Sequence, residues 1–161
     1  MSLTVLETIA SKLLTRLEGM TAGSYNTDVS SVYRLATNGG EYAVQHLQIV
    51  IKQGDDEIVD ELMRPGNPPA IAHRQVFNLR CHVLPSERDT DPVETTNNTF
   101  AADVIKCLTA PANWYQWDGN AFDTQIGSVQ VINEDGGIDG FNLPITVTYR
   151  VDENDPYEVR A

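Results

Sequence analysis

The sequence predicts an α+β fold: a roughly five-stranded antiparallel or mixed sheet with two helices packed on one face and a long loop between the second and third strands. Two amphipathic segments with a helical repeat stand among segments whose apolar residues alternate. A chain of 161 residues has the usual length of one domain. We find no internal repeat and no low-complexity linker, so we expect residues 1–161 to form a single unit.

Two segments have the apolar repeat of a helix with one buried face. In 3–18, leucine and isoleucine recur three or four positions apart, and Gly19 stands where a helix usually ends. In 93–109, four large apolar residues share one face, and Asp91 and Pro92 precede them as an N-cap and a first helical residue. Each helix must cover its apolar face, and the sheet offers the most economical partner.

Five segments have the alternation or the apolar content of strands. They are 29–36, 43–52, 74–84, 125–133 and 143–151. Asn38-Gly39-Gly40 has turn chemistry, so we expect the first two strands to form a hairpin. Asp135-Gly136-Gly137 predicts a second hairpin between the last two strands. Pro144 has no N–H to donate, and we expect it at a strand end or on the sheet edge.

The segment 53–73 is acidic and breaks the strand pattern. Five of the 23 acidic residues lie within 55–61, and prolines close the segment. Its length predicts an extended acidic loop or arm. Such a segment is either a solvated surface excursion or a partner-binding arm anchored by Ile58, Leu62 and Met63, and the sequence favours neither.

Two tryptophans lie in the aromatic, turn-rich segment 113–123. Trp114 and Trp117 either cap the core or form an interface hot spot, so they join Ile58, Leu62 and Met63 as candidate interface residues. Residues 152–161 predict an extended, acidic C-terminal tail.

The charge disfavours several classes of partner. Lys and Arg number 11 and Asp and Glu 23, which gives a net charge of −12. This excess disfavours binding to nucleic-acid phosphates and to anionic membranes.

No apolar run predicts a transmembrane helix, and the first residues lack the pattern of a secretion signal. Cys81 and Cys107 form no Cys-x-x-Cys pair, so we expect free thiols in an intracellular or virion protein.

The sequence offers no catalytic constellation. It contains no nucleophile elbow, no phosphate-binding glycine loop and no His-Glu-x-x-His zinc motif. Cys81 and His82 are neighbours on a strand, so their side chains point to opposite faces, and we expect Cys81 in the core. His46, His73 and His82 lack the spacing of zinc ligands, and 133–139 fails the calcium-loop template. We therefore expect no catalytic residue, no metal and no cofactor.

Four short stretches carry a resemblance to a known family. They are Gly23-Ser24-Tyr25-Asn26-Thr27-Asp28-Val29, Val32-Tyr33-Arg34, Ile145-Thr146-Val147-Thr148-Tyr149-Arg150 and Asn154-Asp155-Pro156-Tyr157. Together with the N-terminal amphipathic helix, this order resembles the tail terminator (tail completion) proteins of tailed bacteriophages.

The resemblance implies a virion structural protein without catalysis. Such a protein forms a ring with itself, commonly a hexamer, and caps the head-proximal end of the tail tube. It ends tube polymerisation and contacts the head-side connector, so its partners are its own copies, the tube protein and the connector or completion protein. It would act in the host cytoplasm during assembly and stay in the tail or neck of the virion. DNA would pass through the lumen without specific binding, and we expect an acidic lumen wall that repels phosphates.

Two alternatives stay open. Another neck component, such as a head-completion or connector protein, shares the small size, ring symmetry and acidity of a tail terminator. A small hydrolase or ligand-binding domain would need a pocket with a perturbed acid or base, and the sequence offers only unpaired candidates such as His46 and Asp103.

Overall fold

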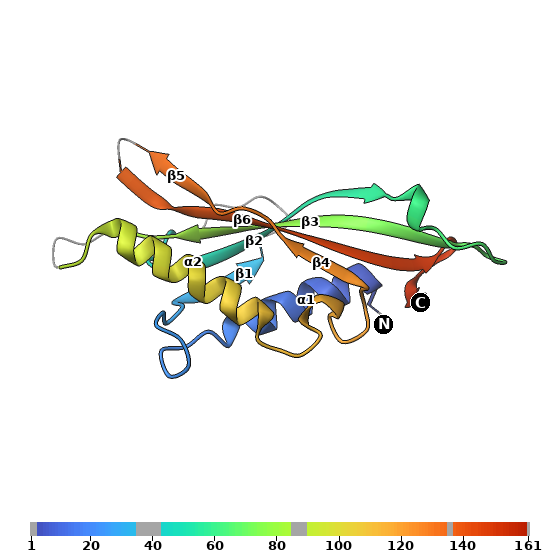
Figure 1. Ribbon diagram of the computed structural model, residues 1–161, viewed down its shortest axis with the longest axis horizontal. Coiled ribbons are helices and arrows are strands. Elements are labelled where there is room, and N and C mark those ends of the chain that lie inside the picture. Colours follow the sequence, from blue (N-terminus) through green and yellow to red (C-terminus); the bar gives the residue numbers. More distant parts are fainter. Residues whose placement is uncertain (1–2, 35–42, 85–89, 135–136, 161) are drawn as a thin grey trace.

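The computed structural model describes residues 3–34, 43–84, 90–134 and 137–160, and within them the fold is α+β. Two helices, α1 (Val5–Glu18) and α2 (Val93–Thr109), lie on the same face of one mixed sheet (Figure 1). The predicted fold class and the one-sided helix layer are confirmed. The described part of the chain contributes seven strands to the sheet, where the sequence predicted about five.

The long strand β6 organises the sheet. The strands are β1 (Ser31–Arg34), β2 (Gln48–Ile58), β3 (Ala70–His82), β4 (Asp123–Ile126), β5 (Gln130–Glu134), β6 (Gly137–Asp152) and β7 (Asp155–Val159). Their order begins β1-β2-β3-β6, and β4, β5 and β7 all pair with β6. Because β3 already occupies one side of β6 along 140–152, the three short strands lie end to end along its other side.

The first two strands do not form the predicted hairpin. β1 runs parallel to β2, with Ser31 opposite Gln48, whereas a tight turn can join only antiparallel strands. The predicted turn at 38–40 lies outside the described residues. The second strand also begins later than predicted, because Leu47 adopts a left-handed backbone conformation (φ 58°) that interrupts the extended chain before Gln48.

The core lies between the two helices and one face of the sheet. Its fully buried side chains include Ile9, Leu13 and Leu17 of α1, Phe100 and Val104 of α2, and Ile49, Phe77, Leu79, Phe141 and Leu143 of the sheet. Cys81 and Cys107 are free thiols within this core, as predicted, and burial raises the pKa of both.

Pro144 is not at an edge, contrary to the prediction. It lies within β6, opposite Asn78 of β3. Its carbonyl accepts the N–H of Gly127 (2.8 Å), so the side of Pro144 that lacks a donor faces the break between β4 and β5. The single strand predicted over 125–133 is therefore two strands, because a ladder bond is missing there and the register shifts by one residue.

Both helices begin slightly later than predicted. Thr4 is the N-cap of α1 and its hydroxyl accepts the N–H of Glu7 (3.1 Å), while Leu3 is exposed. Pro92 precedes α2, and no side chain caps that helix, so Asp91 does not have the predicted role.

Two acidic segments, one predicted as a loop or arm and one as an extended tail, contribute to strands. β2 continues to Ile58 and β3 begins at Ala70, so the connection between them is 59–69, and both ends of the predicted loop 53–73 belong to strands. The connection includes a 3-10 turn, η1 (Asp60–Leu62). The predicted extended tail forms β7, which pairs with the end of β6. Their acidic composition hides the strands from a sequence-based prediction, because a strand whose face is exposed to solvent can carry acidic side chains.

Candidate functional site

The hairpin of β2 and β3 projects past the helices. We call residues 53–77 the arm; Figure 1 shows its tip, with η1, lying beyond the end of α1. Along this projection β2 has no strand on its outer side among the described residues, because β1 pairs only with 48–51. The arm therefore presents unpaired backbone groups as well as side chains to its surroundings.

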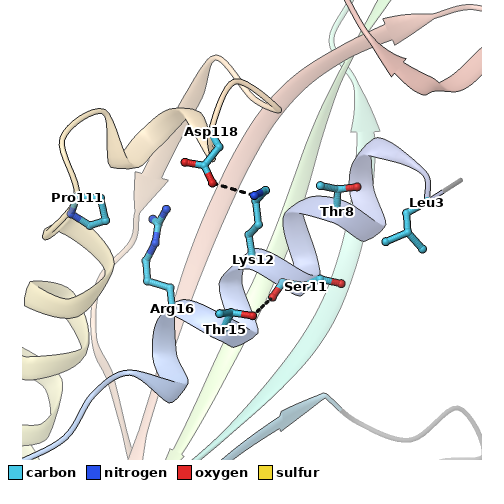
Figure 2. A pocket seen from close by; sticks show the side chains of 8 residues that line it. All are labelled: Leu3, Thr8, Ser11, Lys12, Thr15, Arg16, Pro111 and Asp118. Carbon is cyan, nitrogen blue, oxygen red and sulfur yellow. Dashed lines mark hydrogen bonds and ion pairs between the residues drawn. The ribbon is translucent and has the colours of Figure 1, made fainter.

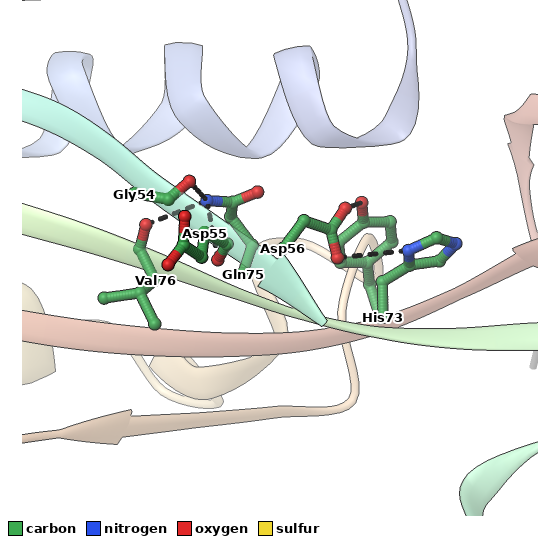
Figure 3. Close-up of polar contacts among 7 residues, drawn as sticks. Gly54, Asp55, Asp56, His73, Gln75 and Val76 are labelled. Carbon is green, nitrogen blue, oxygen red and sulfur yellow. Dashed lines mark hydrogen bonds and ion pairs between the residues drawn. The ribbon is translucent and has the colours of Figure 1, made fainter. Parts of the chain in front are cut away.

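The arm is exposed, acidic and braced from within. Gln75 is buried and its amide donates to the carbonyls of Gly54 (2.7 Å), Asp55 (3.3 Å) and Val76 (2.9 Å), which holds the bulge in β2 in place (Figure 3). Because these carbonyls are satisfied by one buried side chain, the exposed β2 part of the arm has a defined shape. The buried apolar residues of the arm lie outside β2, at Val59, Ala70, Ala72 and Phe77.

A second polar contact ties the arm to β6. The Asp56 carboxylate lies 3.1 Å from His73 Nδ1 and accepts the Tyr149 hydroxyl (3.2 Å), and the His73 ring stacks on Tyr149. Burial, and then the Asp56 charge, raises the pKa of Tyr149. An aspartate–histidine pair can serve as a general base, but no Ser, Thr or Cys bonds to His73 within the described ranges. The pair is best understood as a brace for the arm.

The predicted interface residues of the arm differ in exposure. Ile58 is 56% exposed, which is unusual for an isoleucine on a strand, whereas Leu62 and Met63 are half-buried in and after η1. Ile58 is thus the residue of this group that offers most apolar surface to a partner.

The two predicted tryptophans have different environments. Trp117 is 1% exposed; its indole N–H donates to Thr124 (2.8 Å) and the Arg16 guanidinium lies 3.9 Å from the centre of its ring. Of its two predicted roles, Trp117 therefore has that of capping the core, and it offers almost no surface to a partner. Trp114 is half-buried and packs edge-on against Tyr115.

A hollow of about 550 Å³ separates α1 from the loop that carries the tryptophans (Figure 2). Arg16 crosses from α1 to donate to the carbonyls of Leu108 (3.1 Å) and Trp114 (3.2 Å), and Lys12 pairs with Asp118 (2.8 Å). These polar contacts attach the loop to the helix. The cations that line this hollow are therefore already bound to groups of the chain itself.

The outer edge of the sheet is a surface that the sequence predictions missed. Four apolar residues of β5, β7 and the loop before β5 are exposed: Val129, Val131, Tyr157 and Val159. Their signal was the spacing of two in 129–131 and 157–159, which is typical of a strand with one apolar face. Because these residues are divided between the C-terminal tail and the predicted hairpin, the spacing did not show that they lie along one edge of the sheet.

The remaining titratable candidates do not come together. His46 accepts the N–H of Leu84 (3.0 Å), and Asp103 is buried on α2 with one carboxylate oxygen that has no hydrogen-bond partner in the described part of the chain. His82 lies on the sheet face opposite the helices; burial, followed by the charges of Arg80 and Lys52, lowers its pKa to about 4. Across the described residues, no three metal-binding side chains gather.

Comparison with known proteins adds no relative. No protein-family model matches the sequence, and no curated protein is similar to it. Within the described ranges, no helix has the length and apolar content that crossing a bilayer requires.

Proposed function

We propose that this chain is a phage tail terminator: a virion structural subunit that forms a ring with copies of itself at the head-proximal end of the tail tube. The ring, commonly a hexamer in the family that the sequence resembles, ends tube polymerisation and offers its other side to the head-side connector. DNA passes through its lumen, and the role requires no catalysis.

The observation that carries the proposal is a pair of edges on opposite sides of one sheet that have no partner strand among the described residues. The arm portion of β2 is one edge, and β4, β5 and β7 form the other, with exposed apolar residues on both. A contact between two different edges is heterologous, and a rotation that closes produces a ring. Exposed edges in a monomer are an aggregation hazard, and assembly into a ring covers them.

Particles lacking the protein provide the test. Negative-stain images of such particles should show tails of abnormal length, because nothing ends tube polymerisation. Heads that leak DNA beside free tails of normal length would assign the protein to the head side of the neck and contradict the proposal.

A further inference from the structure

A cationic pocket lies on the outer edge of the sheet, between β7 and β4. The Arg160 N–H donates to the carbonyl of Arg150 (3.0 Å), and the Phe122 N–H donates to that of Thr148 (3.0 Å), so both segments line the same side of β6 with a gap between them. The hollow at this gap has a volume of about 330 Å³ and is lined by Arg64, Arg150 and Arg160 together with Phe122, Val159 and Asn120. We call it the arginine pocket.

Three positions far apart in the sequence supply its charges. Arg150 donates from Nε to the carbonyl of Leu62 (2.8 Å), and its guanidinium lies 4.1 Å from the centre of the Phe122 ring. Arg160 donates to the carbonyl of Pro68 (3.3 Å) and pairs with Asp152. Arg64 is exposed, and its backbone, not its side chain, forms the bridge to Ala70.

The pocket keeps an excess of positive charge. Among the described residues, the salt bridges at its lining are limited to the one between Arg160 and Asp152. Arg64 and Arg150 line the same hollow, and burial, followed by the charge of Arg64, lowers the pKa of Arg150. Gathering like charges is unfavourable unless an anion relieves the repulsion. In a chain of net charge −12, such a pocket favours an acidic partner group.

The opposite edge of the same sheet carries exposed acids. Asp55 and Glu57 lie on the arm portion of β2, separated from the pocket by β3 and β6. The Glu57 carboxylate lies 3.9 Å from Arg74 and its side chain is 69% exposed, which makes a weak, solvated pair. The chain therefore presents exposed carboxylates on one edge. On the other edge it presents the exposed Arg64 guanidinium, beside Arg150 and Arg160, whose guanidiniums also bond to groups of the chain itself.

We propose that the arginine pocket of one copy receives the Asp55 and Glu57 carboxylates of the next copy. This contact rests on the proposed self-assembly and specifies its geometry: it is head-to-tail, so each subunit gives acids on one side and guanidiniums on the other. Guanidiniums bind carboxylates through paired hydrogen bonds, and docking of the acidic edge would relieve the repulsion within the pocket. The contact also fixes which edges meet in a chain whose net charge otherwise opposes association.

Charge reversal tests the contact. Sedimentation velocity on the full chain, over a range of concentrations, compares the wild type with Arg64→Glu, Glu57→Arg and the double variant. Each single reversal should weaken self-association at least about tenfold, and the double variant should regain it, because every interface then carries the reversed pair. Lys106→Glu and Glu18→Arg reverse exposed charges away from both edges and serve as matched controls that should associate like the wild type.

The outcomes separate this contact from the proposed function. Rings that form equally well with Arg64→Glu would overturn the contact and leave the ring intact. Loss in both single variants without recovery in the double variant would also overturn it, since the pocket would then bind another anion. A wild type that never associates, alone or on tail tubes, would overturn the ring itself. Thermal melting of each variant shows that the chain remains folded.

Discussion

The two halves of the β2–β3 pair are stabilised in different ways. Near the helices, 48–51 of β2 are buried and face side chains such as Leu79 and Cys81. In the arm, 53–58 of β2 are exposed, and one buried glutamine and an aspartate–histidine–tyrosine contact hold them to β3 and β6. The same two strands thus pass from a region stabilised by burial to one whose apolar surface is still free. We propose that the second region is the part that meets another molecule.

The largest effect on stability is expected when a core side chain is truncated in the half of the β2–β3 pair that the helices cover. Leu79→Ala removes a fully buried side chain from the core and should lower the free energy of unfolding by about 2–5 kcal/mol. Urea denaturation measures it, and Leu79→Ile, which keeps the volume, should cost less than about 1.5 kcal/mol. A small effect of Leu79→Ala would show that the covered half does not depend on its apolar contacts.

The second-largest effect on stability is expected when the hydrogen bonds of Gln75, which brace the arm, are removed. Gln75→Leu leaves the carbonyls of Gly54 and Val76 without the amide and should cost about 1–3 kcal/mol. Hydrogen exchange should rise within 53–58, more than in the covered half. Gln53→Leu, at an exposed position on the neighbouring strand β2, is the control and should change neither quantity. Equal exchange in both variants would mean that strand pairing alone shapes the arm.

Acid should act on the covered half through His82. Its pKa is about 4 in the folded chain and 6.5 when unfolded, so the unfolded chain binds more protons between these values. Stability should therefore fall by about 1–2 kcal/mol as the pH drops from 7 through this window, and His82→Gln should lose that part of the dependence. A pH profile that is unchanged by the substitution would contradict the assignment to His82.

The smallest effect on stability is expected at Ile58. Because its side chain is 56% exposed, Ile58→Ser should change the free energy of unfolding by less than about 0.5 kcal/mol while weakening self-association. Leu3→Ser, equally exposed but on the chain before α1, should leave both unchanged. Sedimentation and urea denaturation together distinguish an interface residue from an ordinary exposed one.

Local pattern predicted the helices, the face of Cys81 and the strand 74–84 well, because periodicity and burial agree there. It failed where pairing depends on distant residues. The arm portion of β2 is a strand because Phe77 and Gln75 lie opposite it. β1 pairs with β2 in parallel, and the chain enters β2 through a left-handed Leu47. Of the candidate site, Ile58 could be found from its acidic surroundings, whereas three arginines at 64, 150 and 160 become neighbours only after folding.

The most direct test of the central claim is the mass of the assembly that this chain forms, measured on the purified protein and on the protein recovered from tail ends. The claim is that the chain works by contact among copies of itself. The chain should therefore be found as a closed ring of one fixed stoichiometry at the head-proximal end of the tube. A chain that stays monomeric in both preparations, or that is missing from the particle, would contradict the claim.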